Sequence, residues 1–203
     1  MRIAAYLLFL LFMVATYAAI RPAAGSGLAS YAVVLVLSFV STAVHELAHA
    51  AAAWRFGARI TEIMVFPLRY RPARRRIELT GRMDGGEVGG FVRYSLDRVG
   101  ARSKHGWIAA AGPAANLALA AILFLVCAML TDRAQWQGGA AQGRLPSDAA
   151  VRTAIGHMWF AATLVPYLSG LAILSLGAGV VNLLPFDGSD GAAILRALRN
   201  RRR

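Results

Sequence analysis

The stretch that decides the fold is LASYAVVLVLSFVSTAVHELAHAAAA, residues Leu28 to Ala53. It is apolar or small almost throughout, and as a helix it is long enough to cross a bilayer, which takes about 20 residues. Three ionisable residues, His45, Glu46 and His49, nevertheless stand inside it. Ionisable groups are costly in a membrane span, and those that occur there usually have a function. The stretch therefore predicts a membrane helix that carries a polar site.

Three further apolar stretches are long enough to span a bilayer, which predicts an all-α polytopic membrane protein. The expected spans cover about 3–20, 28–54, 107–130 and 155–184. The last is too long for one straight crossing, and we expect Pro166 and Gly170 to kink it or to break it in two. Of the 203 residues 58% are hydrophobic, far too many for an ordinary soluble domain. We interpret residues 1–203 as one membrane-embedded domain.

The loop between the second and third spans changes its pattern from long apolar runs to alternation. Ile60 to Ile63 and Arg76 to Thr80 alternate, and a third candidate strand runs from about Glu87 to Tyr94. This predicts a small β-hairpin or three-stranded sheet within 58–95, at the membrane face. Residues 131–148 are expected to form an external loop, and 190–203 a basic helix that rests on anionic lipid.

Basic residues are distributed unequally between the two sides of the predicted bundle. The formal net charge is +12, and twelve Lys or Arg lie between Arg55 and Lys104. Together with Arg2 and the five arginines from Arg196 onward, they fall on one side if all four spans cross. The positive-inside rule then predicts cytoplasmic termini in a plasma (inner) membrane. The first span could instead be a cleaved signal peptide. Because the arginines flank apolar spans without a recognition motif, we expect no nucleic acid as a partner.

The ionisable residues at 45–49 form the pattern HExxH, which is typical of zinc hydrolases. Residues four apart lie on one side of a helix, so His45 and His49 can share one ion. Catalytic zinc takes three protein ligands and one water, which Glu46 can reach as a general base. Asp187 and Asp190 both qualify as the third ligand, although Asp187 could simply form a turn and Asp190 could cap the last helix. The residues alone do not decide between them.

Three spaced motifs resemble those of the site-2 protease family of intramembrane zinc metalloproteases. HELAHA at 45–50 resembles the first, GPAAN at 112–116 the second, and NLLPFDGSDG at 182–191 matches the pattern NxxPxxxxDG. The resemblance covers roughly residues 28 to 200. Asp187 and Ser189 stand where relatives often carry Pro and Leu, so Asp187 could assist or compete at the metal. Asn116 of the second motif could support the site or simply join two helices by a hydrogen bond.

The resemblance implies a role for each motif residue. His45, His49 and Asp190 would bind one Zn²⁺, and Glu46 would be the general base. Asn182 would bind the substrate backbone or the developing oxyanion. A strand and loop with Gly86, Gly89 and Gly90 would guide an unwound substrate by pairing along a strand edge, although the loop could also be a surface turn.

The resulting hypothesis is a zinc endopeptidase that cuts transmembrane or membrane-associated proteins near the cytoplasmic face. Its expected partners are such a substrate and the lipid bilayer, and the sequence gives no indication of the oligomeric state. One alternative is a catalytically inactive membrane interaction protein of the same fold. Another is a metal-ion transporter, which would need ligands along a path across the bilayer rather than one cluster.

Overall fold

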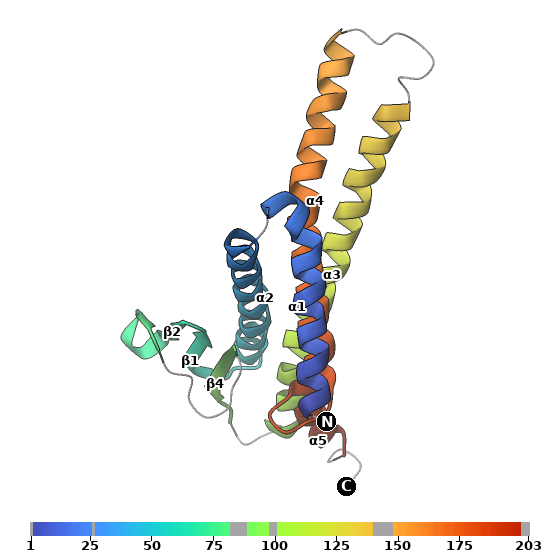
Figure 1. Cartoon of the computed structure of the whole chain (residues 1–203). Coiled ribbons are helices and arrows are strands. Elements are labelled where there is room, and N and C mark those ends of the chain that lie inside the picture. Colours follow the sequence, from blue (N-terminus) through green and yellow to red (C-terminus); the bar gives the residue numbers. More distant parts are fainter. Residues whose placement is uncertain (1, 26, 82–88, 98–100, 140–147, 200–203) are drawn as a thin grey trace.

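The computed structural model describes residues 2–25, 27–81, 89–97, 101–139 and 148–199. Within these ranges four helices are long and apolar enough to cross a membrane, over Ile3–Ala24, Leu28–Arg55, Ser103–Thr131 and Met158–Leu183. They belong to α1 (Arg2–Ala24), α2 (Leu28–Arg55), α3 (Ala101–Gly139) and α4 (Asp148–Leu183). Figure 1 shows α3 and α4 side by side, with α1 and α2 packed along their lower parts. The predicted fold class, a polytopic helical bundle with a small sheet, is confirmed.

Helix α2 directs its polar residues toward the protein and its large apolar residues outward. Ser41, His45 and His49 recur every four residues and are buried. Leu35 and Leu47 lie on other sides of the helix and are more than half exposed. A helix that buries polar groups and exposes aliphatic ones is suited to lipid outside and a polar site inside. This arrangement buries the ionisable residues of the span inside the protein.

Helix α3 is longer than expected, and of the two alternatives for the last span, a kink or a break, the break is absent. Helix α4 continues through Pro166 and Gly170 without being divided, and it ends only at Leu183. At Gly170 an added Cβ would lie 2.7 Å from Ile20 Cγ2, so this glycine permits a close contact with α1 instead of breaking the helix. Helix α3 begins at Ala101 and extends to Gly139, so the prediction of a loop from Thr131 was wrong for its first nine residues. Residues 132–137 include good helix formers such as Arg, Ala and Gln, which support this extension. Residues 140–147 lie outside the described ranges.

A small antiparallel sheet lies beside the lower end of α2 (Figure 1). Its strands are β1 (Arg59–Val65), β2 (Leu68–Arg71), β3 (Arg76–Leu79) and β4 (Gly90–Ser95), in the order β3-β2-β1-β4. The described part of the sheet thus has one strand more than predicted. Strand β2 was not predicted, because Pro67 and Pro72 enclose only four residues there. Part of the third predicted strand, residues 87 and 88, lies outside the described residues.

The two faces of this sheet differ in polarity. Leu68 pairs with Leu79 and Tyr70 with Ile77, so these four side chains share one face, on which Ile77 and Leu79 are largely exposed. The carboxylate of Glu62, on β1, is buried on the other face. It lies within 4 Å of three guanidinium groups, those of Arg69, Arg71 and Arg93. The sheet is therefore amphipathic, with a charge network on one face and an apolar surface on the other.

The last described helix is α5 (Asp190–Arg199), and it packs against α3. An added Cβ at Gly106 of α3 would lie 2.7 Å from the Cβ of Ala197, so glycine allows the two helices to approach closely. Helix α5 agrees with the predicted basic helix up to Arg199, and residues 200–203 lie outside the described ranges. Its docking brings its first residue, Asp190, toward α2.

Candidate metal centre

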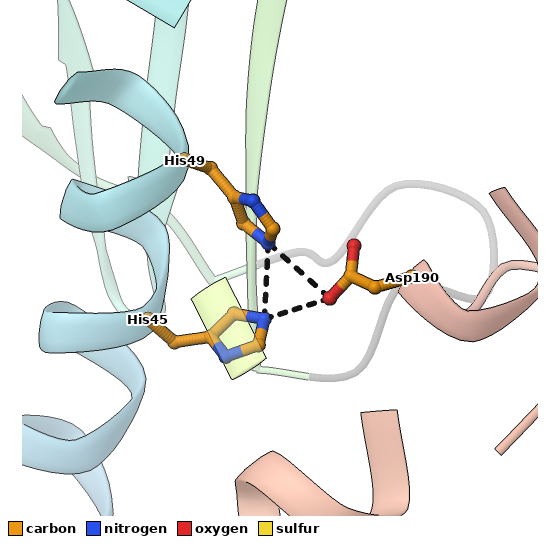
Figure 2. Close-up of side chains that lie close together, drawn as sticks. All are labelled: His45, His49 and Asp190. Atoms are coloured by element: carbon orange, nitrogen blue, oxygen red, sulfur yellow. Dashed lines mark hydrogen bonds and ion pairs between the residues drawn. The ribbon is translucent and has the colours of Figure 1, made fainter. Parts of the chain in front are cut away.

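Three side chains from two distant segments, α2 and the start of α5, converge (Figure 2). His45 Nε2 lies 3.0 Å from Asp190 Oδ2, and His49 Nε2 lies 3.3 Å from the same oxygen. The two Nε2 atoms are 3.1 Å apart. Both histidines are buried and Asp190 is partly buried. Among the described residues these three form a group that could hold a metal ion. Of the two aspartates that the sequence left open, the structure brings Asp190 to the histidines, whereas Asp187 is exposed and lies outside this group.

The geometry and the donor types of this group suit zinc. Three ligands about 2.1 Å from a tetrahedral zinc ion are about 3.4 Å from one another, close to the separations found here. His49 Nδ1 lies 2.7 Å from the carbonyl oxygen of Ile108, which can only accept, so Nδ1 carries the hydrogen. In the neutral ring Nε2 then directs a lone pair at a carboxylate oxygen and at a second imidazole. A metal cation bound among these acceptors would offset the repulsion between their lone pairs.

Helix α3 contributes a glycine that makes space for the group. An added Cβ at Gly112 would lie 2.7 Å from His45 Nε2, and nearer still to the His49 ring. Only a residue without a side chain lets the α3 backbone approach the two imidazoles so closely. Gly112 begins the GPAAN segment, and the sequence analysis gave it no role of its own. A glycine in the sequence does not by itself predict this role, because Gly112 acts only through the space that its missing side chain leaves for the imidazoles.

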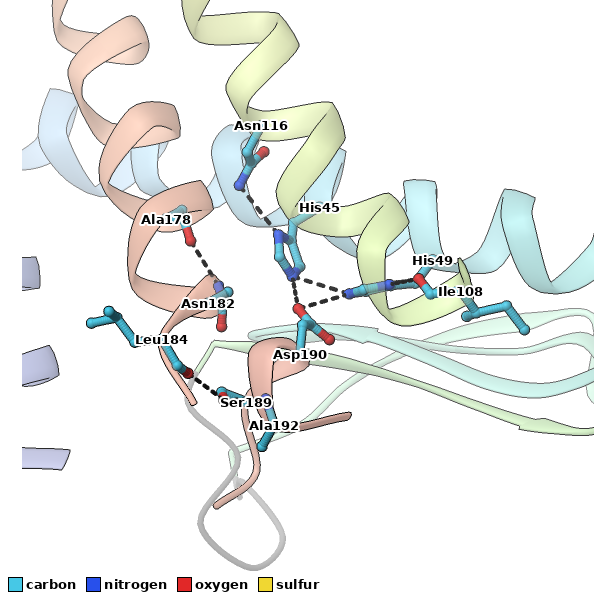
Figure 3. A network of polar contacts seen from close by, with 10 residues as sticks. All are labelled: His45, His49, Ile108, Asn116, Ala178, Asn182, Leu184, Ser189, Asp190 and Ala192. Atoms are coloured by element: carbon cyan, nitrogen blue, oxygen red, sulfur yellow. Dashed lines mark hydrogen bonds and ion pairs between the residues drawn. The ribbon is translucent and has the colours of Figure 1, made fainter. Parts of the chain in front are cut away.

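The position of Asp190 depends on the start of α5. Ser189 Oγ accepts hydrogen bonds from the backbone N–H groups of Ala192 and Phe186, each at 3.2 Å, and donates to Leu184 O (Figure 3). Ser189 is thus the cap of α5, and Asp190, which the sequence alone allowed as the cap, is free to turn toward the histidines. Burial raises the pKa of Asp190, but hydrogen bonds and the charge interaction with the two imidazoles outweigh it and hold the pKa below its ordinary value.

Gly191 explains how α5 can start so close to the end of α4. A Cβ added there would collide with the backbone carbonyl of Leu183. In the Asp-Gly pair, Asp190 is therefore the candidate ligand, and Gly191 lets the start of α5 lie close to the end of α4, which positions that ligand. The sequence pattern contained this signal, since glycine directly follows the aspartate.

Glu46 lies on α2 beside the start of β4. Its side chain is buried, and an added Cβ at Gly90 would lie 2.7 Å from its Cγ and 2.9 Å from its Oε1. Gly89 has a φ of +92°, a left-handed conformation that favours glycine, and it lies against Thr42, one turn before Glu46. The structure thus places one of the three predicted loop glycines, Gly90, against the predicted base, and Gly89 against the preceding turn of the same helix. Gly86 lies outside the described residues.

The two motif asparagines occupy different parts of the site (Figure 3). Asn182 lies in the last turn of α4, where its Nδ2 donates to Ala178 O at 3.0 Å. Asn116 is fully buried on α3, with Nδ2 3.3 Å from His45 Nδ1. The backbone carbonyl of Ile108, which contacts the second histidine, could not be predicted from sequence. Any residue type supplies the same carbonyl group.

Comparison with known proteins agrees with this geometry. The model of Peptidase family M50 matches residues 31–203, which include every residue of the site. No curated protein and no solved structure matches the chain significantly. The family match covers most of the chain and contains both histidines and the aspartate on their separate helices. The chain therefore belongs to peptidase family M50, the site-2 protease family of intramembrane metalloproteases, and its apolar helices make it a multi-pass membrane protein.

Proposed function

We propose that this protein is a zinc endopeptidase that cuts transmembrane or membrane-associated polypeptides near the cytoplasmic face of the plasma membrane. The observation that carries the proposal is that the side chains of His45, His49 and Asp190 lie close together inside a protein built of apolar, membrane-length helices. Two imidazoles and a carboxylate are ligands that zinc accepts in catalytic sites, which keep one position for water. The proposal includes one Zn²⁺ per chain.

Each polar residue of the site has a separate task in this chemistry. Zinc bound there supplies a Lewis acid, which lowers the pKa of water and polarises the scissile carbonyl. The Glu46 carboxylate, buried next to the first ligand, takes a proton from the attacking water and passes it to the departing amine. Asn182 uses one N–H on Ala178 O, and its second N–H serves to bind the substrate carbonyl or the developing oxyanion.

Strand β4 offers a place for an extended substrate beside this machinery. It is the outer strand of the described sheet, next to β1. The N–H of Phe66 donates to Gly89 O at 2.8 Å, so alternation in the antiparallel pair directs the backbone groups of Gly90 and Val92 to the opposite edge. A peptide that pairs along this edge would present its backbone next to Glu46. Because a helical substrate must unwind before its carbonyl can be attacked, strand pairing stabilises the form that is cut.

The amphipathic sheet also supports the lipid bilayer as a partner. Its apolar face exposes Ile77 and Leu79 by 69% and 80%, on β3, in a sheet that packs against α2 through β1 and β4. Aliphatic and aromatic side chains with arginines on the opposite face suit the boundary between acyl chains and headgroups. The excess of arginine in this loop supports a cytoplasmic position for it and for both termini.

The test compares wild type with Glu46→Gln, purified and reconstituted with single-span membrane peptides. We expect both proteins to bind one zinc, and only wild type to cleave. Glu78→Gln is the matched control, since Glu78 pairs with Arg71 on the sheet, and it should cleave normally. Zinc bound without Glu46-dependent cleavage would contradict the protease. Zinc flux across the liposomes would instead favour a transporter.

A further inference from the structure

Both imidazoles of the candidate metal centre have their second nitrogen directed at α3. His49 Nδ1 donates to the backbone carbonyl of Ile108, which fixes its tautomer with Nε2 toward the centre. His45 Nδ1 meets a side chain instead, the carboxamide of Asn116, at 3.3 Å from Nδ2. The two histidines are thus oriented by one helix that supplies none of the three ligands.

The carboxamide of Asn116 has an unsatisfied atom. Asn116 is fully buried, and its Oδ1 has no hydrogen-bond partner among the described residues. An unpaired buried amide oxygen costs about 1–3 kcal/mol. Rotation of the carboxamide by half a turn exchanges oxygen and nitrogen with almost no change of shape. The same side chain can therefore face His45 as a donor or as an acceptor.

The tautomer of His45 decides which of these orientations fits. With Nδ2 facing it, Nδ1 accepts, and Nε2 carries a hydrogen that it can donate to Asp190 Oδ2 at 3.0 Å. A metal ligand needs the opposite tautomer, with the lone pair on Nε2 and the hydrogen on Nδ1. That hydrogen needs an acceptor inside the bundle, and Asn116 Oδ1 is the atom in place.

We propose that Asn116 is a positioning residue that accepts the Nδ1–H of His45 through Oδ1 and thereby holds His45 in the tautomer that binds metal. This inference rests on the proposed metal centre and assigns a specific role to the asparagine of the GPAAN segment. If Asn116 only joined α2 and α3, either a donor or an acceptor would be sufficient at this position. The proposed role requires a hydrogen-bond acceptor facing His45 Nδ1.

The test measures zinc affinity by competition with a chromophoric chelator. Asn116→Leu keeps the size of the side chain but removes the acceptor, and its affinity should fall about 10- to 100-fold. Asn116→Asp keeps an acceptor but cannot donate when ionised, so it should bind zinc far more tightly than the leucine variant. Ser175→Ala is the matched control, because it removes another buried hydrogen bond between helices, to Ser41, and should leave affinity unchanged.

Nitrogen-15 NMR of labelled histidine gives a second readout that does not depend on affinity or folding of the variants. In zinc-loaded wild type, His45 should show a protonated Nδ1. A protonated Nε2, wild-type affinity in Asn116→Leu, or equal loss in the aspartate and leucine variants would each overturn the inference. The two outcomes for the variants leave the protease proposal intact. A protonated Nε2 would also remove His45 from the proposed ligands, and a wild-type protein that binds no zinc would overturn both proposals.

Discussion

Replacement of Gly112 by alanine should weaken metal binding severely, although it adds only a single methyl group. The added Cβ would lie 2.7 Å from His45 Nε2, whereas a relaxed contact needs about 3.5 Å. One or both imidazoles must therefore withdraw by about 0.8 Å, or α3 must move away. Zinc–ligand distances vary by only about 0.2 Å, so a shift of this size removes a ligand from bonding range.

The expected loss is large in function and smaller in stability. A misplacement near 1 Å costs about 100-fold in rate, equivalent to about 2.7 kcal/mol of transition-state stabilisation. Overpacking of a filled core costs about 1–3 kcal/mol of folding stability. We expect Gly112→Ala to fold, to bind zinc at least about 100-fold more weakly, and to lose cleavage by at least the same factor.

The assay is zinc competition and peptide cleavage in parallel with thermal unfolding in detergent. Gly177→Ala is the matched control, since its added Cβ would lie 2.7 Å from Phe12 Cβ on α1, in an equally tight contact away from the ligands. It should lose stability but keep zinc. If Gly112→Ala bound zinc as tightly as wild type, the zinc could not be held by His45 and His49 beside Gly112, and the assignment of the metal centre would be refuted.

Three further predictions concern the neighbours of the ligands. Gly90→Ala should keep zinc but lower kcat, because its Cβ would displace Glu46. If zinc affinity fell by the same factor as kcat, Gly90 would affect the metal ligands as well as the general base. Ser189→Ala should destabilise α5 by about 1 kcal/mol and weaken zinc binding modestly, which thermal unfolding with and without zinc would measure. Asp190→Asn should lose zinc while Asp187→Asn keeps it, as metal analysis after dialysis would show; the reverse result would assign the third ligand to Asp187.

The sequence was sufficient to predict the spans because membrane helices reveal themselves by length and hydropathy. It was less informative where hydropathy falls while the helix continues, as it does after Thr131 in α3. Strand β2 was missed because its four residues from Leu68 are too few for alternation to stand out between two prolines. Pro166 was expected to kink the last span or to break it in two, and the break does not occur, since neighbouring helices can hold a proline-containing helix together.

The residues of the candidate site that act through their side chains could be predicted from the sequence. His45 and His49 are spaced to lie on one side of a helix with Glu46 beside the first of them, and Asp190 followed from its motif. The contributions of α3 were not predictable, because Ile108 acts through its backbone and Gly112 through the absence of a side chain. The capping role of Ser189 could have been predicted, because a hydroxyl residue stands directly before an amphipathic helix. It was not considered, because only the two aspartates were compared.

The separation of the ligands along the chain sets an order of events during biosynthesis. A nascent chain inserted only as far as α4 holds two of the three donors, and Asp190 joins them only when α5 has been made and has docked on α3. Until that step the growing polypeptide has no complete centre with which to attack the translocation machinery or neighbouring nascent proteins. Late arrival of Asp190 makes proteolytic competence a property of the finished bundle.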